Sequence, residues 1–457
     1  MAVSGDISDR LLAECIGRPR APAELQWLCD NVGGRTSGAE SGHRAEEWAH
    51  HLLRRWGLAN VRFDSFPVTV WTRGSIDAEV LGSTGWRLTA LAHGNAPRAA
   101  DVTAHVVDVG HGEREQWLAA TDTVGGAIAL CDEGASAGRR PLHRTEKLGL
   151  AIELGAAGLM IVSSAPGGLP RTGVCHEGES PIPSAGISLE DGERLRRLLK
   201  AGAAPEARVR MANGMARATA RNVLADLPGS EAPGEVVLAG AHLDSWDVAQ
   251  GATDNGLGTA IVLEAARALA AVGRAPRRTL RFALWAAEEV GLLGSRRYAE
   301  RNADVLADHV AVMNFDMTGD PFGYWTPGRE EPAPLLRGLV AQLAGLGMRE
   351  EWSHRAGLHS DHQPFMLAGV PVVGLQGRIV GDGGHYYHSV GDTFEKVSLP
   401  ALARAAAVAA HTLWALADAP ERPYAMMDPA GVRAMVEEAG LREALEAEGY
   451  DGPPMRA

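Results

Sequence analysis

Three apolar, strand-like runs in the second half of the chain are each followed closely by histidine or acidic residues. The runs span residues 235–241, 279–286 and 309–315, and the polar side chains beyond them are His242, Asp244, Glu288, Glu289 and Asp316. Helical stretches at residues 256–271 and 295–302 separate the runs, as in a mostly parallel sheet covered by helices. Ligands bind at the carboxyl ends of strands in such sheets, so we expect these side chains to converge. The pattern predicts an α/β protein with a polar site at one edge of its sheet.

Two further polar residues stand in loops. Asp254 lies just before the helical stretch 256–271, and His388 lies in a turn-like stretch beyond a strand expected at residues 371–375. Each candidate alone is typical of an ordinary hydrogen-bonded or solvated residue, but their co-occurrence indicates a metal site, because a cation removes the cost of burying unpaired carboxylates. Imidazole and carboxylate ligands suit zinc, with manganese or cobalt as alternatives, and two ions about 3.5–4 Å apart need a bridging carboxylate.

The length of the chain and a change in its residue pattern predict more than one domain. A chain of 457 residues exceeds what one hydrophobic core usually serves. Short β-like runs alternate with Gly/Pro-rich turns from about residue 66 to residue 216, which favours an inserted small α/β domain. We therefore expect one domain in two parts, 1–70 and 217–420, an insertion at 71–216 and a helical tail at 421–457. A single helix is expected in that tail, at residues 429–447.

Charge and cysteine usage exclude several classes of protein. A net charge of -13 opposes a nucleic-acid partner, because phosphate binding depends on clustered lysine and arginine. The N-terminus carries no secretory pattern, and the apolar stretch 401–416 is shorter than the roughly 20 residues that cross a bilayer, so we expect a cytoplasmic protein without a membrane partner. The four scattered cysteines predict reduced, mostly buried thiols, which leaves histidines and carboxylates as metal ligands.

At the level of motifs, the chain resembles the co-catalytic zinc exopeptidases, the family of bacterial leucyl aminopeptidases and glutamate carboxypeptidase. The stretches that carry the resemblance are AHLDSWD at 241–247, GATDN at 251–255, WAAEEVG at 285–291, NFD at 314–316 and YHSVGDT at 387–393. It extends from about residue 32 to residue 415 and is closest to the plasma glutamate carboxypeptidase (carboxypeptidase Q) branch. Residues 144–162 are similar to the protease-associated domain inserted in that branch. The resemblance implies a zinc-exopeptidase fold, with a mostly parallel mixed sheet, covering helices and an inserted lid domain.

The resemblance also implies which residues hold two zinc ions. One ion would be bound by His242 and Asp316 and the other by Glu289 and His388, with Asp254 bridging them. The peptide bond after Asp254 would be cis, as in the family.

The implied reaction is hydrolysis of small, unblocked peptides by an aminopeptidase or dipeptidase. Two metals would activate a bridging water as hydroxide and polarise the scissile carbonyl. Glu288 would be the general base that passes the proton to the leaving amine, and Asp244 would orient the ring of His242. Tyr387 would hydrogen-bond the developing oxyanion, or else pack as a turn aromatic.

The same fold is compatible with functions other than peptide hydrolysis. A catalytically silent, receptor-like protein is disfavoured because every implied ligand and Glu288 are present. A metal-dependent amide hydrolase or glutaminyl cyclase stays open, and the sequence also leaves a homodimer open.

Overall fold

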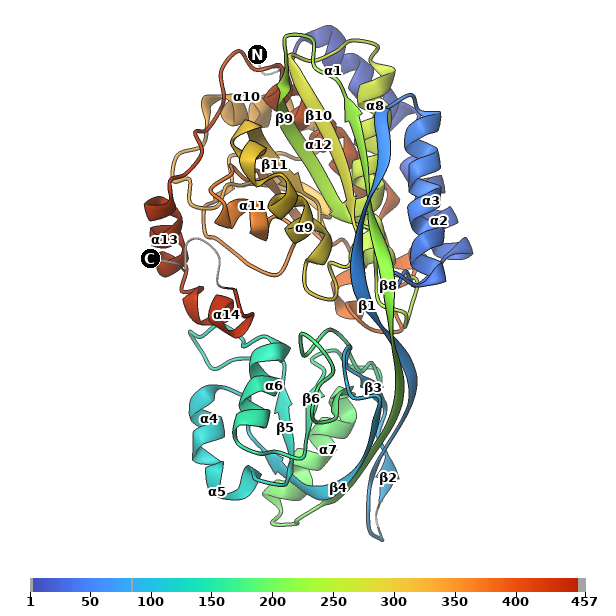
Figure 1. The fold of residues 1–457 in the computed structure, drawn as a ribbon, viewed down its shortest axis with the longest axis vertical. Coiled ribbons are helices and arrows are strands. Elements are labelled where there is room, and N and C mark those ends of the chain that lie inside the picture. The colour runs from blue at the N-terminus through green and yellow to red at the C-terminus, as the bar shows by residue number, and fades with distance from the viewer. Residues whose placement is uncertain (1–2, 84, 451–457) are drawn as a thin grey trace.

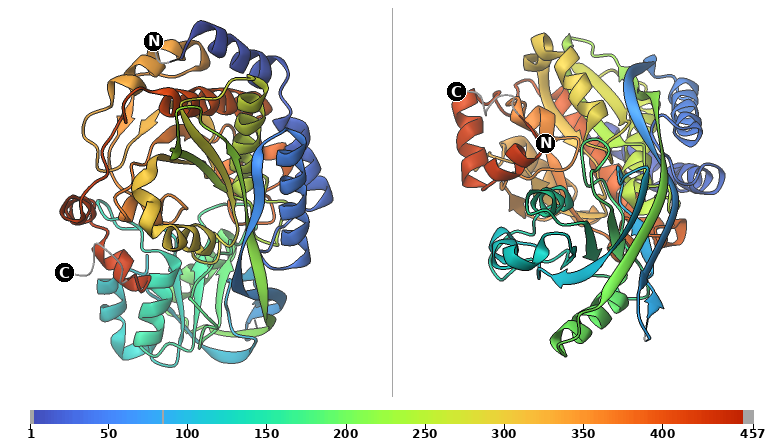
Figure 2. Two further views of the ribbon diagram at one scale, coloured as in Figure 1. Left: turned by 45° about the horizontal axis from the view of Figure 1, so that its top comes forward. Right: turned by 60° about the horizontal axis from the view of Figure 1, so that its bottom comes forward.

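The computed structural model describes residues 3–83 and 85–450, which form two bodies joined by a long two-stranded ribbon (Figures 1 and 2). The ribbon consists of the antiparallel strands β1 (Ala59–Val80) and β8 (Glu206–Leu227). The boundaries predicted at 70/71 and 216/217 lie opposite each other in it, since Val70 pairs with Ala216. Both crossings of the chain between the bodies therefore run side by side.

One continuous sheet runs through both bodies. The order of the described strands is β11-β9-β10-β8-β4-β5-β6-β7-β3, with β1 paired to β8 and β2 to β1, and a smaller sheet has the order β13-β12-β14. The remaining strands are β2 (Trp86–Arg87), β3 (Ala90–Ala92), β4 (Ala99–Asp108), β5 (Ile128–Asp132), β6 (Gly158–Val162), β7 (Ser184–Ile187), β9 (Ala232–His242), β10 (Arg278–Trp285), β11 (His309–Asn314), β12 (Asp320–Trp325), β13 (Trp352–Ser353) and β14 (Gly374–Arg378). β9, β10 and β11 are parallel and β8 is antiparallel to β10, so the predicted mixed α/β sheet is confirmed.

Helices cover the sheet in both bodies (Figure 1). They are α1 (Gly5–Leu12), α2 (Ala21–Asn31), α3 (Glu40–Arg55), α4 (Arg114–Ala119), α5 (Thr121–Val124), α6 (Arg144–Glu153), α7 (Leu189–Lys200), α8 (Leu257–Ala271), α9 (Leu293–Arg301), α10 (Pro334–Gln342), α11 (Gln363–Leu367), α12 (Leu399–Asp418), α13 (Pro429–Glu438) and α14 (Arg442–Ala447). α4 to α7 belong to the inserted body, and α13 and α14 form the C-terminal tail.

The alternation of side chains along β9 explains the layers of the larger body. Val237 and Ala239 point to one face, in the core cluster that includes residues of α8 and α12. Leu238 points to the other face, in a cluster with Tyr298 of α9 and Phe365 of α11. A strand covered on both faces is apolar along its length, as the sequence of β9 shows.

Helix α12 is a core helix of this body. Among the described residues it is the one helix long and apolar enough, by length and composition, to cross a membrane, and 78% of its apolar window is buried inside the protein. Its neighbours include α8, β9 and β10. The four cysteines are free and buried, which confirms the prediction made for them.

Several element boundaries differ from the sequence prediction. The strand expected at 371–375 lies further on, as β14, and in the predicted range Val372 makes only an isolated bridge to Val312. The single tail helix expected at 429–447 is broken into α13 and α14. Gly440 lies at the break with φ +67°, a left-handed conformation that commonly ends a helix and that glycine adopts without strain.

Candidate active site

The site forms where the parallel strands of the larger body end. His242 is the last residue of β9, Asp316 lies two residues beyond β11, and the Glu288–Glu289 pair follows β10. Asp254 precedes α8, and His388 comes from the loop after β14. The structure brings these five predicted ligands and Glu288 together, as the convergence of parallel strand ends requires.

The five predicted ligands form two clusters that share Asp254. Nε2 of His242 lies 3.2 Å from Oδ1 of Asp254 and 3.4 Å from Oδ1 of Asp316. Nε2 of His388 lies 3.0 Å from Oδ2 of Asp254 and 3.1 Å from Oε2 of Glu289. Each oxygen of the Asp254 carboxylate thus serves a different cluster, which is the arrangement of a bridging ligand.

The donor set of these clusters fits divalent zinc. Each cluster has one imidazole nitrogen and two carboxylates, ligand types that zinc accepts while keeping an open position in catalytic sites. The second oxygen of Glu289, Oε1, is buried and has no hydrogen-bond partner among the described residues. An orphaned buried carboxylate oxygen is expensive unless a cation neutralises it.

The electrostatics of the site also favour a bound cation. Burial, reinforced by Asp316 and Asp361, raises the pKa of Glu288 well above its ordinary value. At His388 burial favours the neutral ring, but Glu289 and Asp254 outweigh it and raise the pKa to about 9. The shift at His388 arises from buried negative charge, which a bound cation would balance, and a cation would also favour the charged form of the buried Glu288.

Backbone contacts aim Asp254 at both clusters. The carboxylate of Asp392 accepts hydrogen bonds from the N–H groups of Thr253, at 2.7 Å, and Asp254, at 3.0 Å. The peptide bond after Asp254 is cis, as expected. The Asn255 side chain donates to the carbonyl of Phe315 at 2.8 Å, so the bridging loop is tied to the residue before Asp316.

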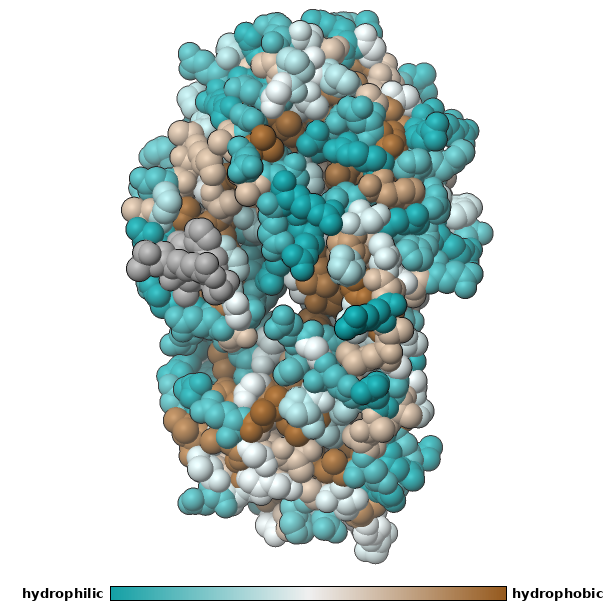
Figure 3. All heavy atoms as spheres, in the orientation of Figure 1, coloured by the Kyte–Doolittle hydropathy of each residue, from teal (hydrophilic) through white to brown (hydrophobic). Residues whose placement is uncertain are grey.

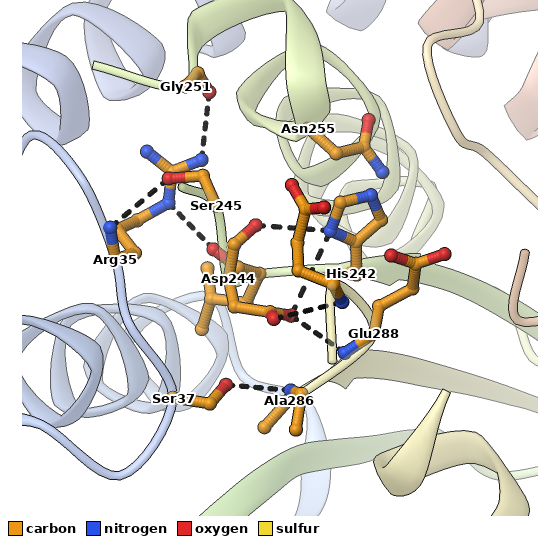
Figure 4. Close-up of polar contacts among 12 residues, drawn as sticks. Arg35, Ser37, His242, Asp244, Ser245, Gly251, Asn255, Ala286 and Glu288 are labelled. Atoms are coloured by element: carbon orange, nitrogen blue, oxygen red, sulfur yellow. Dashed lines mark hydrogen bonds and ion pairs between the residues drawn. The ribbon is translucent and has the colours of Figure 1, made fainter. Parts of the chain in front are cut away.

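Asp244 makes different contacts from those expected. Its carboxylate lies 3.8 Å from Nδ1 of His242, and it is the backbone carbonyl of Asp244 that lies 3.0 Å from that nitrogen. The carboxylate instead accepts from the backbone N–H groups of Glu288, at 3.2 Å, and Glu289, at 3.3 Å (Figure 4). Asp244 therefore positions the loop that carries the glutamate pair.

The inserted body reaches His388 through its backbone, a contact that the sequence did not reveal. Nδ1 of His388 lies 3.1 Å from the carbonyl of Thr172, and the N–H of Thr172 donates to the carbonyl of His388 at 2.9 Å. A ring nitrogen that donates in this way leaves Nε2 free to bind a metal. Tyr387 stacks on the ring of His388, with the two ring centroids 3.7 Å apart. Burial raises the pKa of the Tyr387 hydroxyl, and the residue lines a cavity beside the two clusters.

Arg35 is a second supporting residue that the sequence did not reveal. It is fully buried, and its guanidinium donates to the carbonyls of Leu243, at 2.6 Å, and Gln250, at 2.6 Å. It also donates to the carbonyl of Gly251 at 2.8 Å (Figure 4). These carbonyls lie at both ends of the loop between His242 and Asp254. Arg35 therefore clamps the loop that separates two predicted ligands.

An open cavity of about 540 Å³ adjoins both clusters. Its lining residues include Glu288, Met317, Trp325, His359, His362, Leu375 and Tyr387. In the cavity wall Ser360 donates to Asp316 at 2.6 Å, and the side chain of the neighbouring Asp361 is buried. The molecule is hollowed between its two bodies on the face seen in Figure 3.

Comparison with known protein families gives two matches. The model of peptidase family M28 matches residues 222–413, and the PA domain model matches residues 100–195. Carboxypeptidase Q of Mus musculus is 30% identical over 410 residues, covering 88% of this chain and 86% of that protein. The Homo sapiens protein of that name is 29% identical over 432 residues, covering 92% and 91%. These matches confirm the resemblance carried by the motifs.

Two solved structures have a fold similar to that of this chain. A peptidase M28 precursor from Shewanella amazonensis is 27% identical, with a TM-score of 0.80 over 92% of this chain and 98% of that chain. A zinc aminopeptidase from Bacillus subtilis, 23% identical, has a TM-score of 0.66 over 89% of this chain and 97% of that chain. The arrangement of sheet, covering helices and insertion is therefore that of known peptidases.

Proposed function

The chain belongs to peptidase family M28, and we propose that it is a zinc exopeptidase that uses two ions to hydrolyse small, unblocked peptides. The observation that carries the proposal is the pair of ligand clusters that share the Asp254 carboxylate. Zinc at these positions lowers the pKa of a water molecule and polarises a carbonyl group. The name of the Bacillus subtilis neighbour supports zinc as the metal.

Glu288 is the general base in this proposal. Its carboxylate lines the cavity beside both clusters, and no described side chain pairs with it. The backbone N–H of Glu288 donates to the carboxylate of Asp244, which fixes the backbone from which the Glu288 side chain extends into the cavity. It takes a proton from the attacking water and passes it to the nitrogen of the leaving amine.

Tyr387 supplies a hydrogen-bond donor to the same space. Burial raises the pKa of its hydroxyl, so the phenol keeps its proton at neutral pH. A protonated hydroxyl beside His388 can donate to the oxygen on which negative charge develops during attack at the carbonyl. The net charge of -13 supports a small peptide rather than a nucleic acid as the ligand.

The test combines metal analysis with a substrate panel. We expect two zinc ions per chain, and release of free amino acids from unblocked dipeptides or tripeptides but not from N-acetylated ones. A chain that takes up no zinc when zinc is added would overturn the metal assignment. Turnover of N-blocked amides or cyclisation of N-terminal glutamine, without release of amino acids from unblocked peptides, would replace the exopeptidase with another reaction.

A further inference from the structure

We infer that Glu448, just beyond α14, is a positioning residue that holds His359 in the wall of the substrate cavity. Through this contact the C-terminal tail takes part in peptide binding. The inference rests on the proposed function, because it concerns how the same cavity binds a peptide.

The Glu448 carboxylate is an anchor with three partners. Its Oε2 accepts from the side chains of Gln363, at 2.9 Å, and Arg296, at 3.0 Å. Its Oε1 lies 3.1 Å from Nδ1 of His359, and the Glu448 side chain is only 14% exposed. An exposed ion pair contributes little, but a largely buried carboxylate with several charge-assisted contacts has one defined geometry. All three partners belong to the catalytic body, so the carboxylate fastens the tail to it.

The conformation of His359 depends on contacts of this kind. It lines the same cavity as Glu288, its side chain is 41% exposed, and its backbone has φ +66°. Residues other than glycine seldom adopt this left-handed conformation unless their surroundings impose it. The N–H of His359 donates to Oε1 of Gln363 at 2.8 Å, so Gln363 holds the backbone while Glu448 holds the ring.

The ring of His359 also meets the inserted body. It stacks on the ring of His143, next to α6, with the centroids 4.5 Å apart, and α14 itself contacts α6. With one ring face on His143 and Nδ1 toward Glu448, Nε2 is the polar atom left for a ligand, and no described residue pairs with it. Held in this way, Nε2 can form a hydrogen bond with a polar group of a bound peptide.

The experiment is a double-mutant cycle on the full chain with the zinc enzyme. Glu448→Gln keeps the shape and the acceptor for Arg296 and Gln363 but removes the charge that faces His359. His359→Asn removes the ring, and asparagine tolerates the left-handed backbone. Glu437→Gln is the matched control, because Glu437 lies in the same tail and pairs with exposed Arg442.

We expect Glu448→Gln and His359→Asn each to raise KM for a dipeptide about tenfold, the size of one charge-assisted hydrogen bond, with kcat little changed. The double variant should be no worse than His359→Asn alone, since Glu448 acts through His359. Glu437→Gln should match the wild type. An unchanged KM in Glu448→Gln, or the same further rise of KM when Glu448→Gln is added to His359→Asn, overturns the inference.

Hydrogen exchange separates this inference from the proposed function. The backbone amides of residues 356–363 should exchange faster in Glu448→Gln than in the wild type, whether or not any peptide is cleaved. Unchanged exchange in that segment contradicts a positioning role. Absence of peptidase activity in the wild type would count against the proposed function instead.

Discussion

Replacing Glu288 by glutamine should remove catalysis and leave the protein and its metal site intact. The carboxylate forms no hydrogen bond or ion pair with a described side chain, so an isosteric amide breaks no contact. Burial raises the pKa of Glu288, which means that the folded protein carries the charged form at some expense. Glutamine removes that expense, and we expect the free energy of unfolding to stay the same or to rise.

The expected loss of rate follows from the role of the group. General acid–base catalysis is typically worth about 10²–10⁴-fold, which corresponds to about 3–5 kcal/mol of activation free energy. KM should change little, because the carboxylate acts on the proton of the attacking water and not on the bound peptide. The fall should therefore appear in kcat.

Glu289→Gln is the matched control, since the two glutamates are neighbours in the chain. Oε2 of Glu289 lies 3.1 Å from Nε2 of His388, and its other oxygen is buried without a partner, so the amide weakens one metal cluster. Loss of an ion present at 100 times its Kd would lower stability by about 2.7 kcal/mol. That loss should lower the Tm by several degrees.

The assay measures zinc content, Tm and kcat for the wild type and both variants. Glu288→Gln should keep two zinc ions and lose turnover, whereas Glu289→Gln should lose an ion and thermal stability. Near-normal turnover in Glu288→Gln, or full zinc content with an unchanged Tm in Glu289→Gln, would refute the reasoning.

Three further predictions follow from particular contacts. The Arg35 guanidinium donates to four carbonyls, since Gly33 accepts as well, at 3.0 Å, whereas a lysine ammonium has three donors. Arg35→Lys should therefore leave at least one carbonyl without a donor, at about 1–3 kcal/mol, and should lower stability in urea denaturation and weaken binding in a zinc titration; unchanged values for both would exclude the clamp. Burial lowers the pKa of His309 to about 4, whereas the unfolded chain takes up that proton near pH 6.5, so the free energy of unfolding should fall by up to about 3 kcal/mol as the pH drops from 6.5 to 4. His309→Gln should flatten this fall in urea denaturation at pH 7 and pH 5, and an identical pH dependence would contradict the assignment. Chelation of zinc should abolish peptidase activity and lower the Tm because it leaves the shared carboxylates unneutralised, and added zinc should restore both; a Tm unaffected by chelation would argue against a buried metal centre.

The sequence by itself determined the chemical character of the site. The apolar runs that became β9, β10 and β11 are followed by His242, Glu289 and Asp316, and parallel strands bring their carboxyl ends to one edge. The local pattern was sufficient because each strand and the polar residues that follow it are adjacent in the sequence. The same locality predicted α8 and α9 within a few residues.

The sequence did not predict the long ribbon of β1 and β8. Each strand is 22 residues long, and exposed and half-buried positions alternate irregularly along both. Such strands are stabilised by pairing with each other across more than a hundred residues of chain, as the register of Val70 with Ala216 shows. Local apolar periodicity therefore detected only parts of them.

Only the tertiary structure decided which residues support the predicted ligands. Thr172 holds His388 through its backbone carbonyl, a group that every residue possesses, so the side chain at that position gave no signal. Arg35 binds carbonyls more than 200 residues away, and Glu448 meets His359 only after the tail has folded back onto the catalytic body. These contacts depend on where distant segments are packed, and that information lies in the folded arrangement of the whole chain.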